Sequence, residues 1–205
     1  MKEVYVVGED PVTKEIVSRI IRDYAPNLYI KGYLPARGGE IKKKMENFNA
    51  FSLSYPVVLL SDMDADDCAP MAKDNLTKGM SSQNSGFIIN IAVDEAEAWL
   101  FADIKGFARY LGVAEEHPSE QKFGGPKKRM EMEIPLKASY FLTHKVIVES
   151  NKKDLKEQIH APGKACKGPE YNPALLPFIK NDWNIEEVRK NSYSLDGMIK
   201  RVSAL

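Results

Sequence analysis

Four short apolar runs alternate with stretches in which apolar residues recur every three or four positions. The β-branched and aromatic content of the runs predicts strands. These strands are expected at residues 3–8, 28–34, 55–60 and 87–93. The intervening stretches predict helices, at residues 13–24, 41–49 and 67–78. Because alternating strands and helices are typical of βαβ units, we expect an α/β fold with an open, mainly parallel sheet flanked by helices.

The strand rhythm ends near residue 104. A helix at 94–103 follows the fourth strand directly, and the remaining chain is expected to be mostly helical. Its main features are a helix at 135–153, a long loop at 160–173 and two short helices around Trp183. We therefore predict two domains, an α/β domain at 1–104 and a helical C-terminal extension at 105–205 packed on it.

Composition narrows the class of protein. The chain has 205 residues, with 29 Lys and Arg against 29 Asp and Glu, and 43% of the residues are hydrophobic. This balance argues against a uniformly basic coat protein for nucleic acid and against an acidic disordered chain. No apolar run approaches the length of a membrane span, and the N-terminus lacks a signal-peptide core. We therefore expect a cytoplasmic protein with no membrane partner.

The charges are unevenly distributed. Residues 60–103 carry nine acids and two bases, whereas residues 122–168 carry eleven bases and five acids. The first segment would concentrate cations, and the second would hold a polyanion such as nucleic acid. The alternative, that solvated helix faces differ in charge by chance, stays open.

Acidic residues follow three of the four predicted strands. Glu9 follows the first strand, Asp62 and Asp64 follow the third, and Glu95 and Glu97 follow the fourth. Ligands of open parallel sheets bind at the carboxyl ends of the strands. Carboxylates gathered there would repel one another, and a divalent cation that prefers oxygen ligands removes the repulsion. The pattern predicts a Mg²⁺ or Mn²⁺ site that acts on phosphate esters.

Other interpretations of the aspartate cluster fit less well. Asp62, Asp64 and Asp66 imitate the start of an EF-hand loop, but Asp67 replaces the required glycine and Lys73 the required glutamate. An aspartyl-phosphate phosphatase normally carries its Asp-x-Asp after the first strand, not the third. A third interpretation stays open, in which Asp66 and Asp67 cap the next helix while Asp62 and Asp64 lie in a solvated loop.

A glutamate after strand one and Asp-x-Asp after strand three resemble the Toprim domain over about residues 1–104. Such domains occur in topoisomerases, primases, recombination proteins and overcoming-lysogenization-defect-type nucleases. The resemblance implies that Asp62 and Asp64 hold Mg²⁺ and that Glu9 has an acid–base or metal role. The sequence departs from the pattern in one place, since the Toprim glutamate is often followed by glycine and here by Asp10-Pro11.

A second resemblance covers most of the chain. Residues 91–103 read Ile-Ala-Val-Asp-Glu-Ala-Glu-Ala-Trp-Leu-Phe-Ala-Asp and resemble the signature of the bacterial domain-of-unknown-function family 4276. The stretch from Gly168 to Leu195 is similar to the end of that family. The family is regarded as Toprim-like and often lies near phage-defence genes. This implies a nuclease, with a protein of a defence system as a candidate partner. Trp99 within the signature is expected in the core.

Individual roles follow from these patterns. Glu9 and Glu95 are the predicted catalytic acid–base residues. The predicted metal ligands are Asp62, Asp64 and Glu9. Asp62 and Asp64 can face one ion because side chains two apart on an extended segment point the same way. Asp66 is a candidate outer-sphere partner of the ion, with helix capping as the alternative.

Roles are also predicted for Glu97 and for several basic residues. Glu97 is a second candidate outer-sphere residue, or pairs instead with a base from the C-terminal lobe. Arg37, Lys164 and Lys167 lie in predicted loops and are expected to contact phosphate. The lysines at 42–44 are expected on a solvated helix face.

The sequence thus predicts a divalent-metal-dependent phosphoryl-transfer enzyme, most simply a nuclease. Two alternatives stay open. One is a non-catalytic Toprim-like module that binds nucleic acid or a partner protein, and the other is a phosphohydrolase of small molecules. The choice between DNA and RNA is not predicted.

Overall fold

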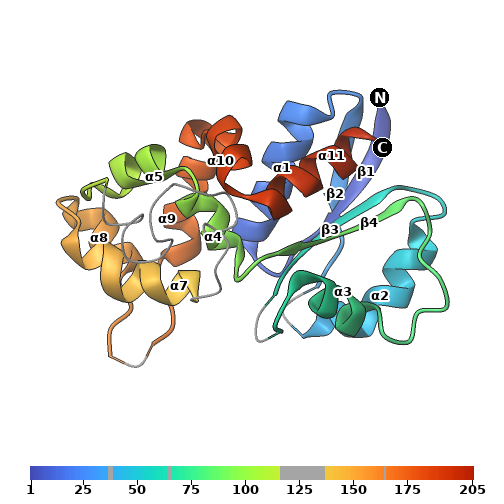
Figure 1. The fold of residues 1–205 in the computed structure, drawn as a ribbon, viewed down its shortest axis with the longest axis horizontal. Coiled ribbons are helices and arrows are strands. Elements are labelled where there is room, and N and C mark those ends of the chain that lie inside the picture. The colour runs from blue at the N-terminus through green and yellow to red at the C-terminus, as the bar shows by residue number, and fades with distance from the viewer. Residues whose placement is uncertain (37–38, 64–65, 116–136, 164) are drawn as a thin grey trace. The chain divides into compact units, whose positions relative to one another are not determined.

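The computed structural model describes residues 1–36, 39–63, 66–115, 137–163 and 165–205 (Figure 1). The chain forms two compact units. The first comprises residues 1–92 and 197–205, and the second comprises residues 93–196. The division therefore falls after Ala92 and returns the C-terminus to the first unit, whereas the predicted domains met after residue 104.

The first unit is an open parallel sheet flanked by helices. Its strands are β1 (Lys2–Val7), β2 (Leu28–Tyr33), β3 (Val57–Asp62) and β4 (Phe87–Ala92). They are ordered β2-β1-β3-β4, and each neighbouring pair is parallel. The helices between them are α1 (Pro11–Tyr24), α2 (Glu40–Phe51) and α3 (Ala69–Thr77). The predicted fold class is confirmed.

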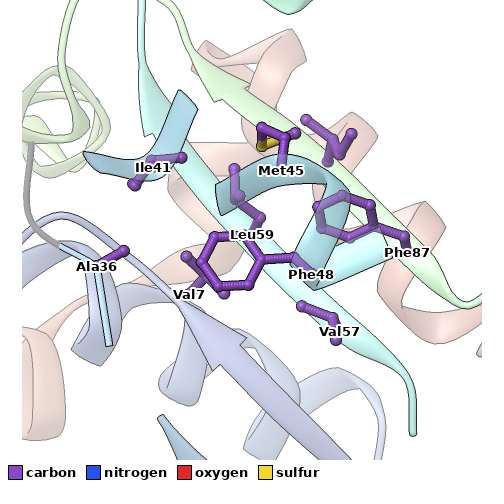
Figure 2. Packing of buried hydrophobic residues seen from close by; sticks show 9 residues of the cluster. Val7, Ala36, Ile41, Met45, Phe48, Val57, Leu59 and Phe87 are labelled. Atoms are coloured by element: carbon purple, nitrogen blue, oxygen red, sulfur yellow. The ribbon is translucent and has the colours of Figure 1, made fainter. Parts of the chain in front are cut away.

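Helices cover both faces of this sheet. Helix α1 and residues 197–203 lie on one face, and α2 and α3 lie on the other (Figure 1). On α2, buried side chains recur at Ile41, Met45 and Phe48 and pack against the β3 residues Val57 and Leu59 (Figure 2). This is the spacing of one helix face, which explains why a strongly polar segment still folds onto the sheet.

The strand register aligns the carboxyl ends of the two central strands. Val7 of β1 pairs with Leu59 of β3, and Asp62 of β3 pairs with Ala92 of β4. Residues that follow β1 and residues that end β3 therefore lie at the same edge of the sheet.

The second unit is mostly helical, as predicted. The α-helices in its described residues are α4 (Ala96–Phe101), α5 (Ile104–Leu111), α7 (Ala138–Phe141), α8 (Lys153–Ile159), α9 (Tyr171–Pro177) and α10 (Ile185–Asn191). Two π-helices, η2 (Leu142–Val146) and η4 (Phe178–Asp182), and a 3₁₀-helix, η3 (Ile147–Glu149), continue them. Helix α11 (Tyr193–Ser203) begins in this unit and ends in the first.

Helix boundaries in the second unit differ from those predicted. The helix expected to reach residue 153 ends at Glu149, because Ser150 is extended and its hydroxyl donates to the carbonyl of Leu111. Helix α9 begins at Tyr171, inside the predicted loop at 160–173. The segment after it holds more than two helices, since Asn184 caps the separate helix α10 through the backbone N–H of Glu187.

Among the described residues, no helix combines the length and the apolar character needed to cross a membrane.

Candidate functional site

Glu9 and Asp62 meet at one cavity of the first unit. Glu9 lies in the turn after β1, and Asp62 is the last residue of the adjacent strand β3. Both line a cavity of about 270 Å³. Its other lining residues include Lys42, Ser61, Asp66 and Asn75. The expectation that residues distant in the chain converge at this edge of the sheet therefore agrees with the structure for Glu9 and Asp62.

Glu9 is held in place from two sides. The hydroxyl of Ser61, on β3, donates a hydrogen bond to Glu9 Oε1 with an oxygen–oxygen distance of 3.0 Å. On the other side, Asp10 caps α1, because its Oδ1 accepts from the Thr13 backbone nitrogen at 2.8 Å. Pro11 occupies the first turn of that helix, where its lack of an N–H has no cost. The Asp10-Pro11 sequence thus builds a tight helix start directly after the glutamate.

Gly8 allows the close approach of β1 to this helix. A Cβ atom at Gly8 would lie 2.7 Å from Thr13 Oγ1 and 3.0 Å from the Lys14 backbone nitrogen. Any side chain would push the turn that carries Glu9 away from the cap.

Asp66 also lines the cavity and has a defined partner. The side-chain amide of Asn75, on α3, donates to Asp66 Oδ1 at 2.7 Å. Asp66 does not cap α3, because the N-cap position of that helix is Cys68. The capping alternative for Asp66 is therefore wrong, and its outer-sphere role stays a prediction. Asp64 lies outside the described residues.

A lysine that the sequence analysis assigned to a solvated face reaches this cavity. Lys42 follows the buried Ile41 on α2 and lines the cavity wall while remaining exposed. Lys44, two residues on, instead donates to the Pro35 carbonyl at 2.9 Å and to Glu40. Arg37, the predicted phosphate contact, lies outside the described residues. Of the three lysines at 42–44, Lys42 is thus the one that lines the cavity with Glu9 and Asp62.

The donor set at this cavity fits a hard divalent cation. Mg²⁺ is usually held by one or two carboxylates together with water and substrate oxygens, and Glu9 and Asp62 supply two carboxylates from one edge of the sheet. Within the described ranges, from which residue 64 is missing, no three His, Cys, Asp or Glu side chains form a ligand group.

Glu95 belongs to the second unit and anchors a helix there. Its Oε2 accepts from the backbone nitrogen of Ser139 at 2.6 Å. The carboxylate of its neighbour Asp94 accepts from the backbone nitrogens of Lys137 and Ala138, each at 2.8 Å. Asp94 adopts a left-handed backbone with φ of 68° to make these bonds. The pair satisfies the first N–H groups of α7, and the catalytic role of Glu95 stays a prediction.

Glu97 is buried and paired, as one of the two sequence interpretations expected. Its Oε1 accepts from the Tyr171 hydroxyl at 2.7 Å and from Lys167 Nζ at 3.2 Å. Lys167 also lies over the Tyr171 ring, 4.6 Å from its centroid. The base from the C-terminal lobe that pairs with Glu97 is thus Lys167. The contact of Lys167 with phosphate stays a prediction. Lys164 lies outside the described residues.

Trp99 is fully buried, which confirms its assignment to the core. Its indole N–H donates to Ser194 Oγ at 2.8 Å. The bond joins α4 to the first residues of α11 within the second unit. Trp99 therefore stabilises the unit and presents no exposed ring.

A larger cavity, of about 670 Å³, lies in the second unit beside the buried Asp103. Burial raises the pKa of this carboxyl, and the backbone N–H groups of Asn184 and Gly106 lower it in part. Those two groups donate to Oδ2 and Oδ1 at 2.9 and 3.1 Å. Asp103 caps α5 and also accepts from the backbone N–H of Asn184. The sequence signals this role only through the position of Asp103 before a helix.

Residues 8–164 of the chain match the family described as Domain of unknown function (DUF4276). Among solved structures, the C-terminal region of the Burkholderia pseudomallei OLD protein aligns over 98% of each chain, at 13% sequence identity and a TM-score of 0.43. No curated protein matches the chain. The family match spans most of the sequence, including the turn that carries Glu9, the end of β3 and the Glu95–Glu97 segment. The chain therefore belongs to the DUF4276 family.

Proposed function

We propose that this protein is a divalent-metal-dependent phosphoryl-transfer enzyme that cleaves nucleic acid. The observation that carries the proposal is the meeting of Glu9 and Asp62 at one cavity at the carboxyl ends of adjacent parallel strands. Sites at this edge of open parallel sheets bind ligands because loops and helix starts surround them.

Asp62 and Glu9 would hold Mg²⁺ or Mn²⁺, with Asp64 as a further ligand predicted from the Asp-x-Asp pattern. When bound, such an ion would neutralise charge that develops on the phosphoryl group during transfer. Asn75 orients Asp66 toward the same cavity, which would let Asp66 accept hydrogen bonds from water around the ion.

Two other side chains have assignable roles in hydrolysis. The carboxylate of Glu9 would take a proton from the attacking water, with Ser61 fixing its orientation. The water oxygen forms a bond to phosphorus while one ester P–O bond breaks, and the departing oxygen takes a proton from solvent. Lys42 would bind the non-bridging phosphate oxygens from the cavity wall.

Nucleic acid is the proposed substrate for two reasons. The Glu9 and Asp62-x-Asp64 pattern resembles that of Toprim domains, which occur in enzymes of nucleic-acid metabolism. Residues 122–168 carry eleven bases and five acids, a composition suited to a polyanion.

The test uses the full chain and labelled DNA and RNA, single- and double-stranded, with Mg²⁺, with Mn²⁺ or with EDTA. We expect cleavage with at least one metal and none in EDTA. Asp62→Asn should lower the rate by about 100-fold or more, because it removes a charged ligand of the ion. The matched control is Asp67→Asn, which changes an exposed aspartate outside the cavity lining and should leave the rate unchanged.

Two outcomes would contradict the proposal. Binding of nucleic acid without cleavage in any metal would favour the non-catalytic binding module. Turnover of a small ester, bis(4-nitrophenyl) phosphate, without cleavage of any polymer would favour a phosphohydrolase of small molecules.

A further inference from the structure

An exposed tyrosine of the second unit stacks face to face on a histidine. Tyr140, on α7, is 52% exposed. Its ring lies parallel to that of His144, with centroids 4.2 Å apart and an interplanar angle of 17°. A large aromatic ring that is fixed and still half open to solvent offers a flat surface for a second ring.

The ring pair is held rigidly by its own unit. The helix that carries Tyr140 starts at backbone N–H groups bound by Asp94 and Glu95. His144 lies in the π-helix η2, and its Nδ1 is 2.7 Å from the hydroxyl oxygen of Thr143. A preorganised platform loses little conformational entropy when it binds a partner.

Basic residues continue the surface away from Tyr140. The ring of His160 lies 6.5 Å from that of His144, and its Nδ1–H donates to the Thr143 carbonyl at 3.0 Å. His160 in turn lines a cavity of about 410 Å³ together with Lys153, Lys156 and the acidic Glu157 of α8. We call this set, Tyr140, His144, His160, Lys153 and Lys156, the stacking surface.

The charge around the stacking surface favours an anionic partner. The described residues between 137 and 168 include six lysines and three acids. Lys153 is exposed at the first position of α8, while the Lys156 ammonium donates to the Val148 carbonyl. An exposed aromatic ring and lysines of the same unit are the elements that bind single strands, where the ring stacks on a base and the ammonium groups contact phosphates.

We propose that the stacking surface binds single-stranded nucleic acid, with one base on Tyr140 and phosphates at Lys153 and Lys156. A duplex fits less well, because its bases are already stacked on one another and present no free face. The surface uses none of the residues proposed for catalysis, so the inference holds whether or not the protein cleaves its ligand.

The test is fluorescence anisotropy with labelled twelve-nucleotide oligothymidylate and oligouridylate, in EDTA so that no metal-dependent step contributes. Tyr140→Ala should weaken binding by about tenfold, the effect expected from losing one stacked base. Tyr140→Phe keeps the ring and should bind within twofold of the wild type. Tyr29→Ala removes a comparably exposed tyrosine of β2 and should change nothing. Circular dichroism checks that each variant is folded.

The lysine contribution is measured separately. Lys153→Gln should reduce the slope of log affinity against log salt by about 0.7, the value for one phosphate contact on a single strand. An unlabelled duplex of the same length should compete poorly. The proposal is overturned if neither oligonucleotide binds, if Tyr140→Ala binds as tightly as the wild type, or if Tyr140→Phe loses as much affinity as Tyr140→Ala.

Discussion

Ser61 shows how one hydroxyl connects two strand ends. Its residue is 6% exposed, and its Oγ donates to Glu9 Oε1 across the boundary between β3 and the turn after β1. A hydrogen bond to a charged group contributes about 1.5–3 kcal/mol. The bond restricts the rotation of the Glu9 carboxylate.

This contact makes Ser61 a positioning residue for the proposed hydrolysis. Ser61→Ala should lower kcat by about tenfold, while KM changes less than twofold, because the lost bond orients Glu9 and leaves the cations that bind phosphate intact. Steady-state kinetics on a labelled oligonucleotide separate the two constants. Ser54→Ala, at an exposed position before β3, is the control and should match the wild type. A rise in KM with unchanged kcat would argue against positioning.

At the scale of elements, carboxylates bind the N-termini of helices in both compact units. Asp10 caps α1, Asp94 and Glu95 bind the start of α7, and Asp103 caps α5. A negative side chain at a helix start satisfies backbone N–H groups and interacts favourably with the helix dipole. Glu95, the one of these acids to which the strand-end pattern assigns a chemical role, therefore also contributes to the scaffold.

Asp103 allows a test of such a cap by pH. Burial raises its pKa in the folded protein above the usual carboxyl value of about 4. Above that value the unfolded chain loses the proton while the folded chain still holds it, so the contribution of Asp103 to stability falls as pH rises. We expect the free energy of unfolding of the wild type, minus that of Asp103→Asn, to decrease between pH 4 and 7.

Urea unfolding of both proteins at several pH values measures this difference. The substitution also replaces one acceptor oxygen by an amide group, and Asn184 and Gly106 donate to different carboxylate oxygens. A difference that grows with pH would mean that the hydrogen bonds outweigh burial.

At the scale of the molecule, the sequence predicts the strands and the residues that meet at the edge of the sheet. It does not predict which helix side chains reach that edge. Strand periodicity and the geometry of parallel sheets are enough to bring Glu9 near Asp62. Lys42 reaches the same cavity from a helix, whose rotation is set by how Ile41 packs on the sheet.

The partners of the later acids were beyond prediction for a different reason. Ser139 lies 44 residues after Glu95, and Tyr171 lies 74 residues after Glu97. No local pattern specifies which loop or helix returns to a given carboxylate. From the sequence alone, Glu95 and Glu97 could equally form a ligand site at the strand end or accept structural hydrogen bonds from distant residues. Only the tertiary contacts show the structural bonds.

The two proposals together predict that binding and cleavage can be separated by mutation. Asp62→Asn in the full chain should lower metal-dependent cleavage by about 100-fold or more and leave oligonucleotide affinity within twofold, because Asp62 and the stacking surface belong to different compact units. Tyr140→Ala should raise KM about tenfold with kcat unchanged, since a stacked base that takes no part in the bond being broken contributes equally to the ground state and the transition state.

Anisotropy in EDTA and steady-state cleavage, measured on the same preparations, provide both readouts. Loss of affinity in Asp62→Asn would place the main binding surface at the cavity of the first unit and contradict the division of roles. A fall in kcat for Tyr140→Ala would instead mean that the stacked base helps to position the reacting phosphate. The division of roles requires that Asp62→Asn lowers only the rate of cleavage and that Tyr140→Ala raises only KM. This result would agree with catalysis at the edge of the sheet and binding of the strand by the helical unit.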